Sequence, residues 1–186
     1  MTSVRSVAPA VLRRADPAEH PAVGDLLEEA FTASFPITAW YRENLHRIDE
    51  HARDFDVWLA VEEVSGAPLG AVLVARELQH GTAEDPAPGP GALSFRYLAV
   101  APRARGRGVG RLLLDHTVAL ARSRGAGRIA IWSGPQMTAA HHLYEAYGFA
   151  RRPDLETRVV DGGQRLRAYH LDLPAPAGAG PTDRSV

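Results

Sequence analysis

The chain of 186 residues contains no cysteine. This absence excludes disulfide bonds, thiolate metal sites and covalent catalysis by a cysteine nucleophile. Long hydrophobic runs are also missing, since no segment approaches the roughly 20 apolar residues that a membrane span needs. Residues 1–20 lack the apolar stretch of a secretory signal peptide. We therefore expect a cytoplasmic protein with no membrane partner.

An excess of charge of either sign is the next feature that the sequence lacks. It has 21 basic and 22 acidic residues, and its formal net charge is -1. General attraction to nucleic acid or to an anionic membrane is not expected from such a balance, so any anion binding must be local. Hydrophobic residues make up 45% and charged residues 23% of the chain, which is typical of a globular domain of this length.

Hydrophobic periodicity and turn residues predict most of the secondary structure. Residues 10–14 form an expected first strand, and Asp16, Pro17 and Glu19 predict the start of a helix that runs to about Phe31. Two apolar runs around a Ser-Gly turn predict a hairpin. The expected elements after the first helix are a helix over 37–52, strands over 57–63, 68–77 and 92–100, a helix over 108–125, a strand over 127–133, a helix over 138–148, and closing strands over 149–152 and 165–173 around an Asp-Gly-Gly turn.

This order gives about seven strands and about four helices, which predicts an α/β (α+β) protein with a mixed sheet covered by helices. A strand-helix-strand unit over 92–133 lies at its centre. Residues 81–91 hold three glycines and three prolines and predict a surface loop. We expect one domain over residues 8–173 and a disordered tail over 174–186.

The stretch "YLAVAPRARGRGVGRLLL", residues 97–114, places four arginines and three glycines between an expected strand and an expected helix. Glycines at such a turn let an anion approach the backbone amides, and the helix N-terminus attracts phosphate. A solvated basic loop and a nucleic-acid patch are the alternatives. A P-loop would need a lysine and a Ser or Thr after the last glycine, and a dinucleotide site would need GxGxxG after the first strand. Neither pattern is present.

The segment Arg105-Gly106-Arg107-Gly108-Val109-Gly110 resembles motif A of the GNAT-type N-acetyltransferase superfamily, Q/RxxGxG/A. Residues 103–108 match the same pattern in a second register. The register over 105–110 is the better match, because the helix of the family starts directly after the last glycine, as "RLLL" does here. Downstream, "AAHHLYEAYGF" is similar to motif B of the family, about 35 residues after the turn. Two motifs in the right order identify a bacterial member of this superfamily whose substrate is unassigned.

The resemblance implies the GNAT fold, with a mostly antiparallel central sheet, and acetyl-CoA as cosubstrate without a metal. It implies that strand backbone groups bind the pantetheine arm and that amides of the turn bind the pyrophosphate, while arginine side chains could meet the 3′-phosphate. The implied cofactor-binding residues are Leu98, Ala99, Val100, Arg105, Gly106, Arg107, Gly108, Val109, Gly110 and Arg111.

Tyr144 is the implied catalytic residue, because the family assigns to this position the protonation of the thiolate that leaves. A tyrosine with an ordinary pKa of about 10 can act as this acid. The general base stays open among Glu77, His80, Glu43 and water alone, since Ser94 stands where some relatives carry the acid.

Three further positions enter these expectations. Met137 stands where many relatives place an asparagine that contacts the cofactor. His141 and His142 are adjacent on a helix and face different sides, so we expect no shared metal ion.

The function expected from these residues is acetyl transfer from acetyl-CoA to a primary amine of a small molecule, peptide or protein. Residues 32–41 and 153–165 are expected to select the acceptor. A non-catalytic acyl-CoA sensor or interaction module with the same fold is the alternative, and a homodimer is left open. Nucleic-acid binding is disfavoured by the net charge and by the lack of a wider basic stripe.

Overall fold

The computed structural model describes residues 9–79, 89 and 91–174. Most of the expected loop over 81–91, the tail beyond residue 174 and His80 lie outside these residues. The strands are β1 (Ala10–Arg14), β2 (Phe55–Glu62), β3 (Pro68–Ala75), β4 (Ala92–Leu93), β5 (Phe95–Val100), β6 (Arg128–Ser133), β7 (Ala150–Arg151), β8 (Val159–Val160), β9 (Gln164–Arg165) and β10 (Arg167–Asp172). The helices are η1 (Pro17–Glu19), α1 (His20–Thr32), α2 (Ala39–His46), α3 (Ile48–His51), η2 (Pro102–Ala104), α4 (Val109–Ser123), α5 (Thr138–Tyr147), η3 (Pro153–Leu155) and η4 (Asp161–Gly163).

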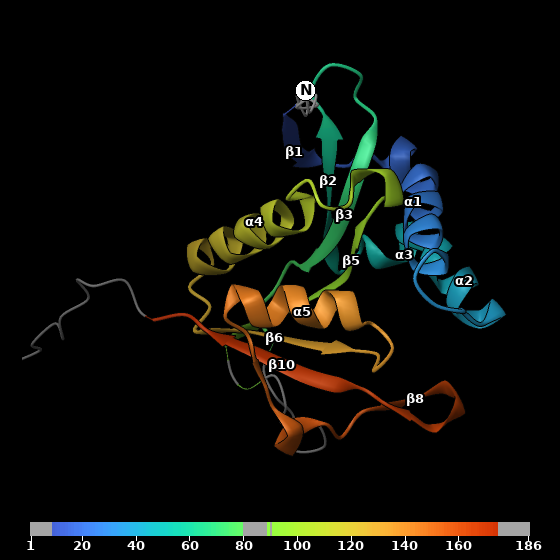
Figure 1. Ribbon diagram of the computed structural model, residues 1–186. Coiled ribbons are helices and arrows are strands. Elements are labelled where there is room, and N and C mark those ends of the chain that lie inside the picture. Colours follow the sequence, from blue (N-terminus) through green and yellow to red (C-terminus); the bar gives the residue numbers. More distant parts are fainter. Residues whose placement is uncertain (1–8, 80–88, 90, 175–186) are drawn as a thin grey trace, which may run out of the picture.

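The strands form two four-stranded sheets and a small hairpin where we expected one sheet (Figure 1). The first sheet has the order β1-β2-β3-β5 and is antiparallel throughout. The second has the order β4-β6-β10-β7, in which β4 pairs parallel to β6. The expected strand over 92–100 therefore changes partner at Ser94: its first two residues pair with β6 and the rest pairs with β3. The pairings are mostly antiparallel, as expected.

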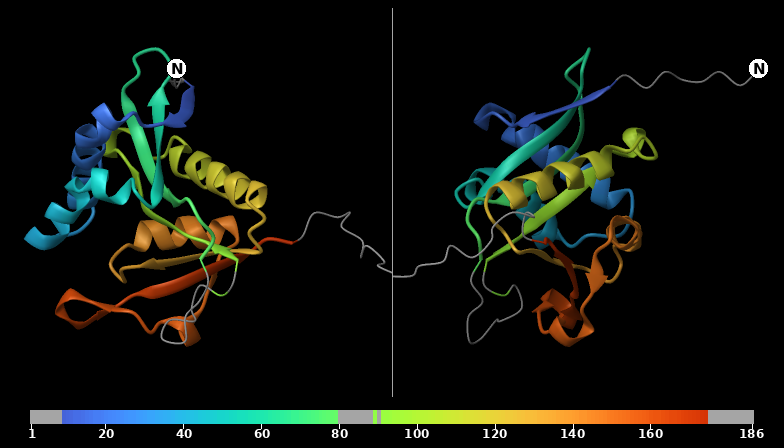
Figure 2. Two further views of the ribbon diagram at one scale, coloured as in Figure 1. Left: turned by 180° about the vertical axis from the view of Figure 1, so that it is seen from behind. Right: turned by 90° about the vertical axis from the view of Figure 1, so that its left-hand side faces the viewer.

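Helices cover both sheets (Figure 2). Helices α1 and α4 each pack against β3 and β5, and α5 lies against β10 through the rings of Tyr144 and Tyr169. Leu27, Leu73 and Leu113 from α1, β3 and α4 are completely buried. Within the described residues, no helix has both the length and the apolar character needed to cross a membrane.

The expected helix over 37–52 is two helices, because the chain leaves helical geometry at Arg47, with φ -83° and ψ 43°. The carbonyl of Asn44 accepts hydrogen bonds from the Arg47 N–H at 3.3 Å and from the His51 ring at 3.1 Å. These bonds end α2, and α3 then turns with Ile48 fully buried. The sequence pattern concealed this break because Leu45 and Ile48 keep helical spacing.

A second correction concerns the Asp-Gly-Gly turn. Residues 161–163 connect β8 to β9, and the closing strands β7 and β10 pair with each other separately. The β8–β9 hairpin projects from the second sheet at the lower right of Figure 1. It lies within the segment over 153–165 that we expected to select the acceptor.

The Asp56 carboxylate on β2 joins the first sheet to the end of α4. Its side chain is only 5% exposed, and it lies 2.9 Å from Arg14, 3.2 Å from Arg76 and 2.8 Å from Arg124. Arg124 also donates to the carbonyl of Ala75. One buried carboxylate therefore compensates three arginines that come from different parts of the chain.

Replacing this carboxylate should destabilise the fold. We expect Asp56→Asn to lower the free energy of unfolding by about 1–3 kcal/mol, because three guanidinium groups lose their only shared anion. Urea denaturation measures the loss. Asp172→Asn is the control, because Asp172 pairs with Arg128 at 2.6 Å but is 74% exposed, so its loss should stay below about 0.5 kcal/mol. Equal losses for the two variants would contradict the special role of Asp56.

Candidate functional site

The turn that leads from β5 into α4 is built from glycine. Gly106 and Gly108 adopt left-handed backbone geometry, with φ 72° and 79°, and Gly108 is the N-cap of α4. No side chain caps this helix. Since the first N–H groups of a helix have no partner within it, the turn presents amides and the positive end of the helix dipole to an anion.

The three glycines of the turn serve two purposes. A Cβ atom added at Gly106 or Gly108 would meet no heavy atom within 4 Å, so these positions need glycine for their backbone angles and leave open space beside the amides. A Cβ atom at Gly110 would lie 3.0 Å from Cδ2 of Leu143, so this glycine lets α4 approach α5.

The first two arginines of the turn bind the body of the protein. Arg103 donates to the carbonyl of Pro68 at 2.5 Å. Arg105 donates to the carbonyl of Ala30 at 2.7 Å and to Oγ of Ser34 at 2.9 Å. They thereby tie the turn to the start of β3 and to the end of α1.

The last two arginines have acidic neighbours. Arg107 is half-buried and lies 3.7 Å from Glu62. Arg111 lies 3.9 Å from Asp115, and its guanidinium sits 5.2 Å from the ring centre of Tyr147. Because all four arginine side chains contact protein groups, the backbone amides are the better candidates for holding an anion at this turn.

The edge of β5 continues directly into the turn. In the sheets of the described residues, β5 pairs only with β3, so its other edge from Phe95 onward has no neighbouring strand. β5 contains a bulge, because Ala99 and Arg96 pair with Ala71 and Leu73, so that three residue steps along β5 oppose two along β3. Tyr97 lies within this bulge and has φ 54°. The edge over Leu98–Val100 can therefore accept an extended ligand as an additional strand.

Ser94 marks the point where β5 leaves the second sheet. It is 7% exposed, and its hydroxyl accepts a hydrogen bond from Nε2 of Gln79 at 2.6 Å. The expected position of an acid thus holds a buried hydroxyl that is engaged in structure.

Tyr144 lies on α5 within a cluster of rings. Its side chain is 6% exposed, and its ring centre is 5.9 Å from that of Phe95, 5.7 Å from that of Phe149 and 5.8 Å from that of Tyr169. Burial raises the pKa of the phenol well above its ordinary value, and Tyr169 adds to this effect. The Tyr144 phenol is therefore neutral across the neutral range.

Of the expected base candidates, Glu43 and Glu77 lie in the described residues, and the contacts that the structure shows for them do not reach this cluster. Glu43 is 65% exposed and binds Arg47 at 2.5 Å, and Glu77 is exposed just after β3. His80 lies outside the described residues.

His51, which sequence reasoning missed, lies closer to the β5 bulge. Its ring centre is 5.2 Å from that of Tyr97, whose ring is in turn 6.4 Å from that of Tyr41. Nε2 of His51 lies 3.1 Å from the carbonyl of Asn44, so this nitrogen carries the proton and Nδ1 can accept one. Burial lowers the pKa of the imidazole. Only the break at Arg47 brings His51 to β5, so no sequence motif could have signalled it.

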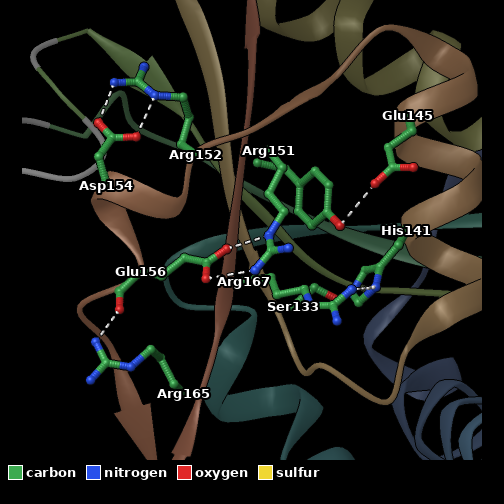
Figure 3. Close-up of polar contacts among 10 residues, drawn as sticks. Ser133, His141, Glu145, Arg151, Arg152, Asp154, Glu156, Arg165 and Arg167 are labelled. Carbon is green, nitrogen blue, oxygen red and sulfur yellow. Dashed lines mark hydrogen bonds and ion pairs between the residues drawn. The ribbon is translucent and has the colours of Figure 1, made fainter.

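A buried polar cluster lies beneath the N-terminal half of α5 (Figure 3). His141 is 3% exposed, with Nε2 at 3.1 Å from Oγ of Ser133 and Nδ1 at 3.1 Å from Arg167. His142 is exposed on the other side of the helix. Oγ of Ser133 lies 3.4 Å from Sδ of Met137, the residue that precedes α5. In the part of the chain that the structure describes, no three His, Asp or Glu side chains are arranged to hold a metal ion.

Comparison with known proteins relates this arrangement to one family. A family model described as the acetyltransferase (GNAT) family matches residues 20–149. A streptothricin acetyltransferase of Streptomyces lavendulae is 40% identical over 86 residues, which are 45% of this chain and 45% of that protein. A mycothiol acetyltransferase of Cellulomonas flavigena is 30% identical over 140 residues, 66% of this chain and 40% of that protein. The matches thus span less than half the length of either relative.

Solved structures share the fold. A GNAT-family acetyltransferase from Staphylococcus aureus superposes with a TM-score of 0.69 at 16% identity, covering 89% of this chain and 100% of that one. A GNAT-family acetyltransferase from Elizabethkingia anophelis with acetyl-CoA bound gives a TM-score of 0.61 at 16% identity, covering 88% and 98%. The expected fold is confirmed.

The His141 cluster makes stability depend on pH. Burial, followed by the charge of Arg167, lowers the pKa of His141 below its ordinary value near 6.5. Between the two pKa values, His141 is protonated in the unfolded chain and neutral in the folded chain. The contribution of neutral His141 to stability is therefore complete above pH 6.5 and is lost as the pH falls through the folded-state pKa. One such proton changes the free energy of unfolding by up to about 1.4 kcal/mol per pH unit.

We expect wild type to lose stability between pH 7.5 and pH 5.5 in urea denaturation, and His141→Gln to show a smaller loss. Burial also lowers the pKa of His51 and His116, so the difference between variants is the informative quantity. His142→Gln, on the exposed side of the same helix, is the control for the substitution itself. The same pH dependence in His141→Gln as in wild type would contradict the assignment.

Proposed function

The chain belongs to the acetyltransferase (GNAT) family, and from this we propose that it transfers an acetyl group from acetyl-CoA directly to a primary amine. One observation carries the proposal: the chain parts from β6 at Ser94, between β4 and β5, so that β5 has an edge without a neighbouring strand in the described sheets, and that edge runs into the glycine turn. The names of the curated relatives and the acetyl-CoA in a solved neighbour support it.

The residues of this site fit acetyl-CoA. The backbone of Leu98, Ala99 and Val100 would pair with the amide groups of the pantetheine arm, as a neighbouring strand would. Amides over residues 105–111 would hold the pyrophosphate, and the space beside Gly106 and Gly108 lets an anion approach them. Among the implied binding residues, Val109 has a side chain that is 3% exposed, so only its backbone could contact the cofactor.

Acetyl-CoA supplies a thioester that a neutral amine can attack. A backbone N–H near the bulge of β5 would stabilise negative charge on the carbonyl oxygen. Tyr144, kept protonated by burial, would donate a proton to the departing sulfur. Direct transfer suits a chain without cysteine.

The proposal includes a general base that removes the amine proton, and several groups are candidates for it. Glu43, Glu77, His80 and water are the choices from the sequence, and His51 joins them because its neutral ring lies against Tyr97. The acceptor-selecting role of residues 32–41 and 153–165 remains a prediction, as does a homodimer.

We also propose that the acetyltransferase domain spans residues 8–173 and that a tail follows from residue 174. The family match over 20–149 lies within this range. The folded elements extend further on both sides, from Ala10 at the start of β1 to Asp172 at the end of β10. A cytoplasmic, bacterial setting is consistent with the use of acetyl-CoA and with the bacterial relatives.

Removing the Tyr144 hydroxyl tests the proposed chemistry. We expect Tyr144→Phe to lower kcat by about 10²–10³-fold, because the leaving thiolate loses its acid, with little change in KM for acetyl-CoA. Release of CoA in the presence of a panel of amines measures both constants. Tyr147→Phe is the matched control, since its hydroxyl binds Asp115 at 2.7 Å near the surface, and it should keep most of the activity.

Two outcomes would count against this account. Full activity of Tyr144→Phe would remove Tyr144 from the reaction. Tight binding of acetyl-CoA by wild type without acetylation of any amine would favour the non-catalytic sensor.

A further inference from the structure

Arg167 lies at one end of the second sheet. It is the first residue of β10 and pairs with Ser133, the last residue of β6. The side chain is half-buried, and its Nη1 atom lies 3.1 Å from Nδ1 of His141 (Figure 3). The polar partners of this cation are therefore an imidazole and the neutral hydroxyl of Tyr169.

That imidazole must be neutral. Nδ1 of His141 can accept the hydrogen bond from Arg167 only without a proton, and Nε2 then donates to Oγ of Ser133 at 3.1 Å. Burial lowers the pKa of His141, in agreement with the neutral form. His141 thus orients the guanidinium without compensating its charge.

Carboxylates near Arg167 are engaged elsewhere. Glu145 accepts a hydrogen bond from the hydroxyl of Tyr169 at 3.3 Å, and Glu156 accepts two from Arg151 at 2.7 and 3.0 Å. Within the described ranges, Arg167 makes no ion pair, although the pKa of Glu156, lowered mainly by Arg151, is lowered further by the charge of Arg167. The first turn of α5 above it contains no acidic residue either.

A half-buried cation with only neutral partners costs free energy that a bound anion would offset. Its position suggests the source of that anion. His141 precedes Tyr144 by three residues, about 4.5 Å along the helix, and the ring of Tyr169 contacts both, at 5.3 and 5.8 Å. His141, which binds Arg167, therefore lies three residues before the proposed acid on the same helix.

We propose that the acceptor is an amine that also carries a carboxylate, as an amino acid does, and that Arg167 binds this carboxylate. The planar guanidinium matches a carboxylate with two parallel hydrogen bonds, which an ammonium group cannot do. The inference deepens the proposed function and rests on it. It makes Arg167 a residue that determines substrate specificity, acting on binding of the acceptor.

The test compares amino acids with their primary amides. CoA release is measured with the common amino acids, with the amide of each active one, and with simple alkylamines and polyamines. Wild type is compared with Arg167→Gln, Arg167→Lys and Arg128→Gln. Glutamine at position 167 can still donate to His141, and Arg128, which binds Asp172 at 2.6 Å at the other end of the second sheet, gives a matched loss of charge.

We expect wild type to acetylate amino acids. Arg167→Gln should lower kcat/KM for the acid by about 10- to 100-fold, mainly through KM, and should change the value for the amide little. Arg167→Lys should restore part of the loss, and Arg128→Gln should behave as wild type. The ratio of kcat/KM for the acid to that for the amide is taken in each protein, and the two proteins are then compared. This comparison removes differences in the intrinsic reactivity of the amines.

The remaining outcomes overturn the inference. An equal loss for acid and amide in Arg167→Gln would show a structural role only. Turnover of amines without a carboxylate, unaffected by Arg167→Gln, would refute the inference while the proposed activity stands. Binding of acetyl-CoA without turnover of any amine would refute both.

Discussion

The structure depends on one constraint: the strand over residues 92–100 cannot pair with β3 and β6 along its whole length. Its first two residues pair with β6, and after Ser94 the chain follows β3. The hydrogen bond from Gln79 to Ser94 lies at this point of divergence. From there β5 presents an edge with no neighbouring strand in the described sheets, and the edge ends where the glycine turn begins α4. The proposed cofactor path is this edge and turn.

Burial, more than charge, sets the protonation states around α5 and β10. Tyr144 is surrounded by rings, and burial raises the pKa of its phenol, which is therefore neutral. His141 and His51 are kept neutral by the same effect. Arg167 makes no ion pair within the described ranges and binds the neutral imidazole of His141, and the carboxylate of the proposed acceptor would supply an anionic partner.

The sequence predicted the local parts of this arrangement well, because they follow from short-range chemistry. Glycines at positions 106 and 108 have the left-handed geometry that only a turn would require, and Gly148 ends α5 with φ 113°. The family motifs located the turn and Tyr144 because both depend on residues close in the chain.

What the sequence could not predict depends on contacts between distant segments. The run over 92–100 is continuously compatible with a strand, so nothing in it marks the change of partner at Ser94. His51 reaches β5 only because the Asn44 carbonyl ends α2 early. Arg167 differs from the other arginines of its segment only in its partner, which comes from a helix about 26 residues earlier.

The central claim, that the β5–α4 backbone binds the cofactor, is tested most directly by calorimetric titration of CoA into wild type, Gly108→Ala and Gly66→Ala. Both glycines have positive φ, 79° and 70°, with open space at Cβ, so both substitutions carry the same backbone strain. We predict that Gly108→Ala weakens CoA binding about tenfold, equivalent to about 1.4 kcal/mol, while Gly66→Ala binds as wild type. Equal affinity in all three proteins, or no binding to wild type, would contradict the claim.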